Sequence, residues 1–192
     1  MKLFHSFLFL LSITVALPAQ KSLTKPLTDT TAPTGMATRW NDSFAEWDIF
    51  TTEKNSRGEL RMSSVTQDDW SRWQYRIGEG VGTIRQKWPD NPNEWEARGD
   101  NTIATARTIF RNNFREWRVT DGTHTVTLRT RYQNLAEDWA LRSDRYGWFE
   151  MYTAYEGDLR DWIIVDELSE EVPLPMRVLL GFLVVYHSTP KL

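Results

Sequence analysis

The stretch "FRNNFREWRV" (Phe110–Val119) has an aromatic residue seven positions before a Trp, Asn residues between them, and an acid directly before the Trp. Close variants stand elsewhere in the chain: "WNDSFAEWDI" (40–49), "WPDNPNEWEA" (88–97), "YQNLAEDWAL" (132–141) and "YEGDLRDWII" (155–164). Five copies of one pattern in a single chain indicate an internal repeat, in which each copy is one supersecondary unit.

Six Trp residues anchor the repeat, and positions in each unit are numbered here relative to its anchor. The anchors are separated by 26, 22, 22, 22 and 23 residues: Trp47, Trp73, Trp95, Trp117, Trp139 and Trp162. Position −7 is aromatic in five units: Trp40, Trp88, Phe110, Tyr132 and Tyr155. The second unit fits least well, because Thr66 stands there instead. Position −5 carries residues that bond their own backbone or tolerate positive φ: Asp42, Asp68, Asp90, Asn112, Asn134 and Gly157.

Each unit predicts two strands. Side chains alternate along a strand, so positions −11, −9 and −7 share one face of the first strand. The anchor and position +2 form the apolar face of the second strand, and a six-residue connection joins the two. We therefore expect the −7 aromatic residue and the anchor Trp to pack against each other across neighbouring strands. The −5 residue is expected to start the turn, and the acid at −1 to be a solvated turn residue.

Six units of two strands predict a mainly β fold, a twelve-stranded antiparallel meander over residues 36–168. Closing the sheet into a barrel removes its exposed edges. Because side chains alone fill the interior only up to about eight strands, a larger barrel needs something else in its lumen. The closing segment, residues 169–192, supplies "PLPMRVLLGFLVVYH" (Pro173–His187), which is apolar on every side except at Arg177. This run predicts a buried helix over 174–187 inside the barrel. One more buried strand is the alternative.

A twelve-stranded barrel closed around a C-terminal apolar helix resembles the tubby-like fold of tubby C-terminal domains, LURP-one-related proteins and phospholipid scramblases. The resemblance covers about residues 36–187 and rests on the strand count and the terminal helix "MRVLLGFLVVYH". It implies a module associated with lipid or with a membrane surface. No phosphoinositide-binding motif can be placed on this sequence, so the resemblance implies no functional positions.

The first residues, "MKLFHSFLFLLSITVALPA" (1–19), have the layout of a secretory signal peptide, and a linker over 20–35 follows. We therefore expect a secreted or periplasmic protein, with a retained membrane anchor as the alternative. The formal net charge of −3 argues against nucleic acid as the main partner. The chain has no Cys, which excludes a disulfide framework and a Cys nucleophile. We expect a monomer.

One set of residues is a candidate for binding an anion. Arg85, Arg107 and Arg129 occupy the same position in three successive units, and we expect them to line up across alternate strands as one column on the polar face. Such a column favours a site for a phosphate, a carboxylate or a sulfated glycan. The alternative is a solvated outer face whose charges are balanced by neighbouring acids.

Catalysis finds no support in the sequence. No phosphate loop, nucleophile elbow or zinc-protease motif is present, and the recurring acids before Trp favour a role in the turns. We therefore expect no enzyme, no metal and no cofactor. The tripeptide "RGD" (98–100) is interpreted as plain turn chemistry.

Four aromatic residues lie off the inward columns and offer an alternative function, a carbohydrate- or protein-binding module: Trp70, Tyr146, Trp148 and Tyr152. An outer-membrane barrel is a further possibility, although its strands would be longer, at about 9–11 residues.

Overall fold

The structure is a computed structural model that describes residues 32–53, 57–64 and 69–191. The expected signal peptide and most of the expected linker lie outside the described residues. The strands are β1 (Pro33–Trp40), β2 (Ser43–Thr51), β3 (Arg57–Met62), β4 (Arg72–Ile77), β5 (Gly80–Gln86), β6 (Glu94–Gly99), β7 (Thr102–Thr108), β8 (Glu116–Thr120), β9 (Thr125–Thr130), β10 (Asp138–Ser143), β11 (Gly147–Thr153) and β12 (Asp161–Leu168). One helix follows, α1 (Leu174–Ser188).

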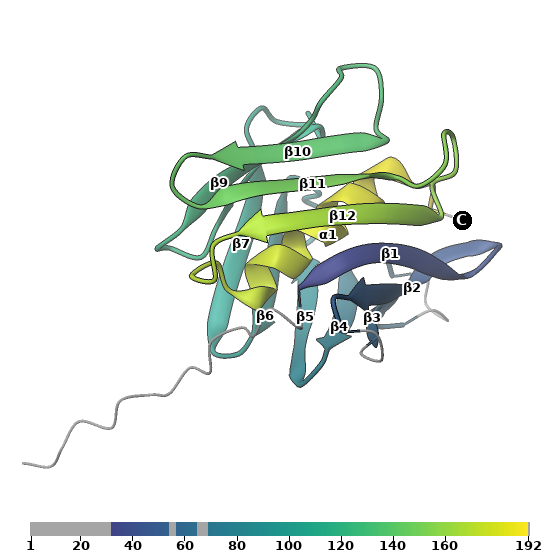
Figure 1. Ribbon diagram of the computed structural model, residues 1–192, viewed down its shortest axis with the longest axis horizontal. Coiled ribbons are helices and arrows are strands. Elements are labelled where there is room, and N and C mark those ends of the chain that lie inside the picture. The colour runs from purple at the N-terminus through teal and green to yellow at the C-terminus, as the bar shows by residue number, and fades with distance from the viewer. Residues whose placement is uncertain (1–31, 54–56, 65–68, 192) are drawn as a thin grey trace, which may run out of the picture.

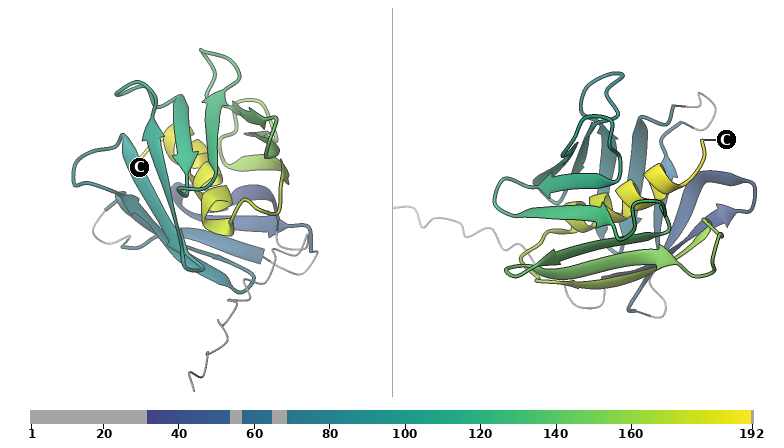
Figure 2. Two further views of the ribbon diagram at one scale, coloured as in Figure 1. Left: turned by 90° about the vertical axis from the view of Figure 1, so that its left-hand side faces the viewer. Right: turned by 90° about the horizontal axis from the view of Figure 1, so that it is seen from above.

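The twelve strands form a closed antiparallel barrel, which confirms the predicted fold class (Figure 1). Each strand pairs with the next along the chain, and β12 closes the sheet against β1, where Met36 lies opposite Trp162. Strand β1 begins at Pro33, three residues before the predicted start of the barrel. Helix α1 runs through the interior (Figure 2), so the helical interpretation of the tail is correct and the strand alternative is wrong.

The anchor Trp side chains all point into the barrel, as predicted. Their exposed fractions are at most 2%. In every unit the indole Nε1–H donates a hydrogen bond of 2.8–3.1 Å to the carbonyl oxygen of the residue three positions before it. A buried indole must find such a partner. The Trp therefore fills the interior and closes the preceding turn at the same time, which no aliphatic residue can do.

The helix packs its apolar side chains against the anchors. Phe182, which is fully buried, lies edge-on to Trp73 and Trp95, with ring centroids 5.5 Å and 4.8 Å apart. Gly181 allows a close approach, because a Cβ there would lie 3.4 Å from the sulfur of Met36. The predicted filling of the lumen by the tail is thus present in the structure.

Arg177, the one charged residue in the apolar run, is held at the start of α1. It is 3% exposed and donates to the carbonyl oxygens of Val172, Leu168 and Ser169 at 2.7–3.0 Å. Its Nη1 also lies 2.5 Å from Asp166 Oδ1, and the Asp166 side chain is only 1% exposed. This clamp ties the first turns of the helix to the end of β12.

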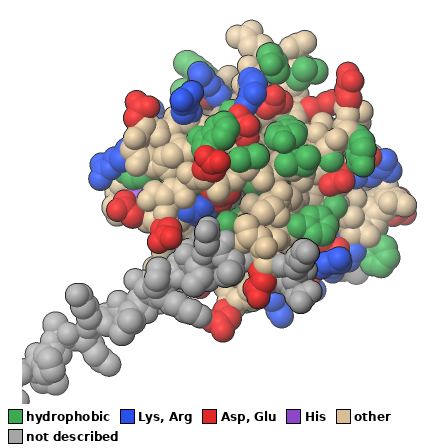
Figure 3. All heavy atoms as spheres, viewed as in Figure 1, with side chains coloured by type: hydrophobic (Ala, Val, Ile, Leu, Met, Phe, Trp, Pro, Cys, Tyr) green, Lys and Arg blue, Asp and Glu red, His purple; other side chains and the backbone are tan. Residues whose placement is uncertain are grey.

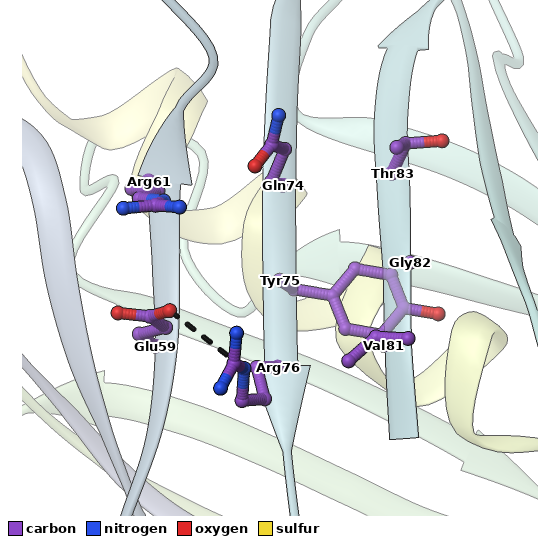
Figure 4. Close-up of a pocket in the computed structure, with 8 residues that line it drawn as sticks. All are labelled: Glu59, Arg61, Gln74, Tyr75, Arg76, Val81, Gly82 and Thr83. Carbon is purple, nitrogen blue, oxygen red and sulfur yellow. Dashed lines mark ion pairs between the residues drawn. The ribbon is translucent and has the colours of Figure 1, made fainter. Parts of the chain in front are cut away.

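The wall between β4 and β5 has room for an interior tyrosine only because Gly82 lacks a side chain. Figure 4 shows the ring of Tyr75 beside Gly82. A Cβ at Gly82 would lie 2.1 Å from the carbonyl oxygen of Arg98 and 2.4 Å from the Tyr75 ring. Glycine is therefore required at position 82 by close packing and not by the backbone conformation.

We expect Gly82→Ala to lower the free energy of unfolding by about 1–3 kcal/mol, because overpacking forces neighbouring atoms out of place. Urea denaturation measures the change. Thr83→Ala is the control, since that exposed neighbour on the same strand should cost less than about 0.5 kcal/mol. Equal stability of Gly82→Ala and the unchanged protein would contradict the packing of Tyr75 described here.

Candidate functional site

The interior of the barrel is filled, so a ligand site must lie on its outside. Leu179, Leu180, Phe182 and Leu183 of α1 have no exposed surface. Barrels that carry a lipid keep an internal cavity for it. The hollows of about 280–600 Å³ at the described surface are lined mainly by outward-facing or turn residues.

Five large aromatic side chains are exposed at one end of the barrel, and this set is called the aromatic rim. Their exposed fractions run from 53% to 70%: Trp40, Trp88, Phe110, Tyr132 and Tyr155. These are the −7 residues, so the prediction that they pack inward against the anchors is wrong. Strands β5, β7, β9 and β11 end at position −9, and the alternation of side chains ends with them. In β1, an irregularity between Thr38 and Trp40 has the same effect.

The turns that carry the rim lie at the end of the barrel where α1 terminates. Figure 2 shows this helix end at the mouth of the barrel. Ser188 at the helix end donates a 2.6 Å hydrogen bond to the carbonyl oxygen of Ala136, and His187 stacks on Phe114 at 5.0 Å. Rim residues of successive units lie two strands apart. At about 4.8 Å per strand, neighbouring aromatic positions are separated by roughly 10 Å.

Inside the rim, the mouth of the barrel is closed by uncharged rings. Burial raises the pKa of Tyr186 to about 12 and lowers the pKa of His187 to about 3. Both side chains are therefore neutral near pH 7. Tyr186 also packs on Trp95 with ring centroids 4.6 Å apart.

The turn connections that carry the rim are fixed by local hydrogen bonds. At position −4, a side-chain oxygen accepts the backbone N–H of position −2 in five units: Ser43, Asp69, Asn91, Asn113 and Asp158. The residue at position −5 has a positive backbone φ in three units, at Asp90, Asn112 and Gly157. The prediction that the −5 residue starts the turn is thus right about the place, but the bonding side chain is one residue later.

Neighbouring turns are also bonded to each other. Asn93 Oδ1 accepts the backbone N–H of Asn112 at 2.6 Å and the hydroxyl of Thr108 at 3.1 Å. Glu137 Oε2 accepts the backbone N–H of Gly157 at 3.1 Å, from the same positions of the next pair of units. Such bonds hold the aromatic residues of adjacent units at fixed spacing.

The acids at −1 were predicted to be solvated turn residues, but they are half-buried and belong to the second strands of their units. Two of them hold rim residues. Glu46 and Glu94 accept the indole N–H of Trp40 and Trp88, each at 3.3 Å. Three of these acids also pair with the basic residue at −8: Arg39 with Glu46 at 3.3 Å, Lys87 with Glu94 at 3.7 Å and Arg131 with Asp138 at 3.5 Å. Two indoles therefore keep one orientation while more than half of each residue stays exposed.

A groove with a volume of about 600 Å³ lies at the rim between the second and third turn connections. Its apolar lining comes from Trp70, Pro89, Pro92 and Tyr186. The rest of its lining is polar and mostly charged: Asp69, Ser71, Arg72, Arg85, Gln86, Lys87 and Asp90. This size falls within the usual range for small-ligand sites, although most such sites have a more apolar lining.

The arginines predicted as a column lie on the outer wall, opposite the buried anchors, as expected. Arg85 is bonded to Glu96 at 3.0 Å, and Arg98 and Arg85 together hold the pKa of Glu96 below its usual value. Strand β6 separates Arg85 from Arg107, so these two are not brought together. Arg107 lies directly opposite Arg118, a residue that the sequence analysis did not single out.

The four off-column aromatic residues do not form one platform. Tyr146 is buried and lies edge-on to His124 near the other end of the barrel. Trp70 packs on Trp73 at the rim, whereas Trp148 and Tyr152 lie on the outer wall of β11.

The tripeptide at 98–100, interpreted as turn chemistry, contributes only its last residue to the turn. Arg98 and Gly99 belong to β6, and Arg98 is bonded to Glu96 at 2.6 Å. Asp100 and Asn101 both have positive φ, 47° and 57°, and form the tight turn to β7. Arg98 is therefore part of the outer wall.

Within the described residues, no three His, Asp or Glu side chains are grouped to hold a metal. The described part of the chain also has no helix long and apolar enough to cross a bilayer. Asp121 and His124 are joined at 2.7 Å, but Asp121 also accepts the backbone N–H groups of Thr123 and His124, so the pair caps a turn.

The chain matches no protein-family model, no curated protein and no solved structure. The resemblance to the tubby-like fold therefore stays a prediction.

Proposed function

We propose that the protein is an exported, non-enzymatic binding module that holds a carbohydrate on its aromatic rim. The observation that carries the proposal is the rim: five turns at one end of the barrel each present an aromatic residue that is more than half exposed. Large aromatic side chains are normally buried, so five exposed ones at equivalent positions need a functional reason.

Stacking on a sugar ring requires an aromatic face that is both open and fixed. The indole N–H groups of Trp40 and Trp88 are bonded to Glu46 and Glu94, which fixes the rings without covering them. A pre-ordered ring loses little conformational freedom when a ligand binds.

Each rim residue is followed by polar groups that suit sugar hydroxyls. Amides or carboxylates stand one to three positions after the aromatic residue: Asn41 and Asp42, Asp90 and Asn91, Asn112 and Asn113, Gln133 and Asn134. Amide groups donate and accept hydrogen bonds and carboxylates accept them, so together they can bond both the hydrogen and the oxygen of a sugar hydroxyl. Apolar faces with nearby polar groups are also the general composition of small-ligand sites.

The spacing of the rim favours a polymer over a single sugar. Neighbouring aromatic residues lie roughly 10 Å apart, so one chain can contact several of them. Weak contacts linked in this way gain affinity through the high effective concentration of the second contact.

A membrane surface is the ligand that the fold resemblance implies, and the rim fits it less well. Two indoles are bonded to the barrel wall and do not project as free anchors. Acidic and basic side chains both spread over the face seen in Figure 3, so that face offers no single-sign patch for anionic lipid.

We expect the triple variant Trp88→Ala/Phe110→Ala/Tyr132→Ala to weaken binding to a glycan by at least about tenfold, because each ring contributes about 0.5–1.5 kcal/mol. A glycan array identifies the oligosaccharide, and isothermal titration then measures the dissociation constant. The variant should unfold with nearly unchanged free energy, because the three side chains are exposed.

The matched control removes three exposed apolar side chains from the outer wall: Phe50→Ala/Val81→Ala/Tyr152→Ala. It should bind like the unchanged protein. Two results together would show that the rim binds a membrane surface rather than a carbohydrate. No glycan would bind, and the protein would sediment with phosphatidylcholine vesicles in a way that the rim variant abolishes. Equal binding by rim variant and control would remove the rim from the function.

A further inference from the structure

On one part of the outer wall, three arginines form no ion pair with any acid of the described residues. On the neighbouring strands, Arg85 and Arg98 contact Glu96 at 3.0 Å and 2.6 Å. By contrast, no acid among the described residues lies within 4 Å of three exposed arginines on successive strands: Arg107 on β7, Arg118 on β8 and Arg129 on β9. Two acids are in register with them, Glu94 opposite Arg107 and Glu116 opposite Arg129, but Glu94 is paired with Lys87 instead.

Two of these arginines face each other directly. Arg107 and Arg118 are register partners in the antiparallel pair of β7 and β8. Side chains in such pairs start about 4.5–5.5 Å apart, and like charges placed there destabilise the sheet. The pair occurs in a chain with a net charge of −3, so an excess of basic residues does not explain it.

The pair lines a hollow with a volume of about 330 Å³. Three cations line this hollow, Lys87, Arg107 and Arg118, against one acid, Glu94, which is 3.7 Å from Lys87. Thr105 adds a hydroxyl group. Planar guanidinium groups match sulfate and carboxylate oxygens in two-point hydrogen bonds, and two of them side by side can hold one anion from both sides.

The hollow adjoins the aromatic rim. Lys87 precedes Trp88 and its Nζ lies 5.9 Å from the Trp88 ring, while Ile109, another lining residue, precedes Phe110. A carbohydrate chain stacked on Trp88 and Phe110 would bring its substituents to the arginine pair.

We infer that the hollow between β6 and β8 binds a sulfate or carboxylate group, and that the ligand of the rim is an acidic glycan. This inference rests on the proposed function and names its substrate class. Arg107 and Arg118 hold the acidic group, and Arg129 adds charge on the next strand. Arg85, neutralised by Glu96, takes no part.

The test compares dextran sulfate with unmodified dextran of the same length, measured by isothermal titration in 50 mM and 200 mM salt. We expect dextran sulfate to bind, and Arg107→Gln/Arg118→Gln to weaken it by about tenfold or more. Arg61→Gln/Arg142→Gln is the matched control, since it removes the same charge from two exposed arginines on β3 and β10. The control should bind within about twofold of the unchanged protein.

Stability gives a second measurement on the same variants. Removing one of two facing like charges should leave the melting temperature of Arg107→Gln unchanged or raise it. A large fall would mean that the arginines serve the fold, and would overturn the inference.

The outcomes separate this inference from the proposed function. If Arg107→Gln/Arg118→Gln leaves dextran sulfate binding unchanged, the anion site is wrong but the carbohydrate function stands. The same conclusion follows if a neutral glycan binds as tightly as its sulfated form. Sulfate-dependent binding that survives loss of the rim aromatics overturns the carbohydrate function and keeps the anion site. Single-stranded DNA or anionic vesicles that bind as tightly, with the same dependence on Arg118, would reassign the site to another polyanion.

Discussion

A chain that ends at Glu171 will not fold into a soluble, cooperatively melting protein. The truncation removes α1, whose residues Leu179, Leu180, Phe182 and Leu183 are fully buried in the barrel. Burial of each such side chain stabilises a fold by about 1.5–3 kcal/mol. The free energy of unfolding of a typical domain is only about 5–15 kcal/mol. Loss of the helix therefore removes more stabilisation than the barrel wall alone has to lose.

Size-exclusion chromatography and near-ultraviolet circular dichroism on heating measure this outcome. A chain that ends at Pro190 is the control, because it keeps the whole of α1 and should melt cooperatively. In the full-length protein, Leu180→Asp should be nearly as damaging as the truncation, since it places an unpaired charge in an apolar centre. A folded protein that ends at Glu171 would contradict the view that the helix completes the core.

The repeat made most of the fold predictable. Side chains along a paired strand alternate, and the anchors recur every 22 or 23 residues through most of the chain, so the inward columns and the strand count followed from spacing. The helix was predictable because an apolar segment outside the repeats had to fill the lumen of a twelve-stranded barrel. These are properties of pattern and volume, which a sequence carries directly.

The alternation of side chains did not predict that the aromatic rim is exposed. The −7 residues keep the parity of the inward column, yet Thr108 is the last residue of β7 and Phe110 lies in the turn beyond it. Strand ends depend on where neighbouring turns bond to each other, as Asn93 does to Asn112, and such bonds join residues that are far apart in the chain. The five aromatic residues were therefore recognised as one repeated position but assigned to the wrong face.

The arginine pair shows the second limit. Arg85, Arg107 and Arg129 attracted notice because they share a repeat position, but residues at one repeat position lie two strands apart. Contacts on a sheet are made between register partners. On β8 the partner of Arg107 is Arg118, and on β6 it is Glu94, both at other positions in the unit. Counting back from the turn between β7 and β8 would have found this pair, because each connection has a fixed length.

Arg177→Met is expected to lower the free energy of unfolding by about 3–5 kcal/mol, the usual cost of breaking a buried ion pair on one side. The substitution keeps an apolar side chain of similar length in the helix. It leaves Asp166, whose side chain is 1% exposed, without its cation. It also removes the donor for the carbonyl oxygens of Leu168, Ser169 and Val172.

Urea denaturation of three variants makes the argument quantitative. Arg160→Met is the matched control, because its ion pair with Asp158 is exposed and should contribute less than about 1 kcal/mol. The double variant Arg177→Met/Asp166→Asn should recover part of the loss, since the carboxylate no longer remains buried and unpaired. Full recovery is not expected, because the three carbonyl oxygens still lack a donor. If Arg177→Met proved as mild as Arg160→Met, the end of β12 would not depend on the clamp, and α1 would be held in the barrel by its apolar contacts alone.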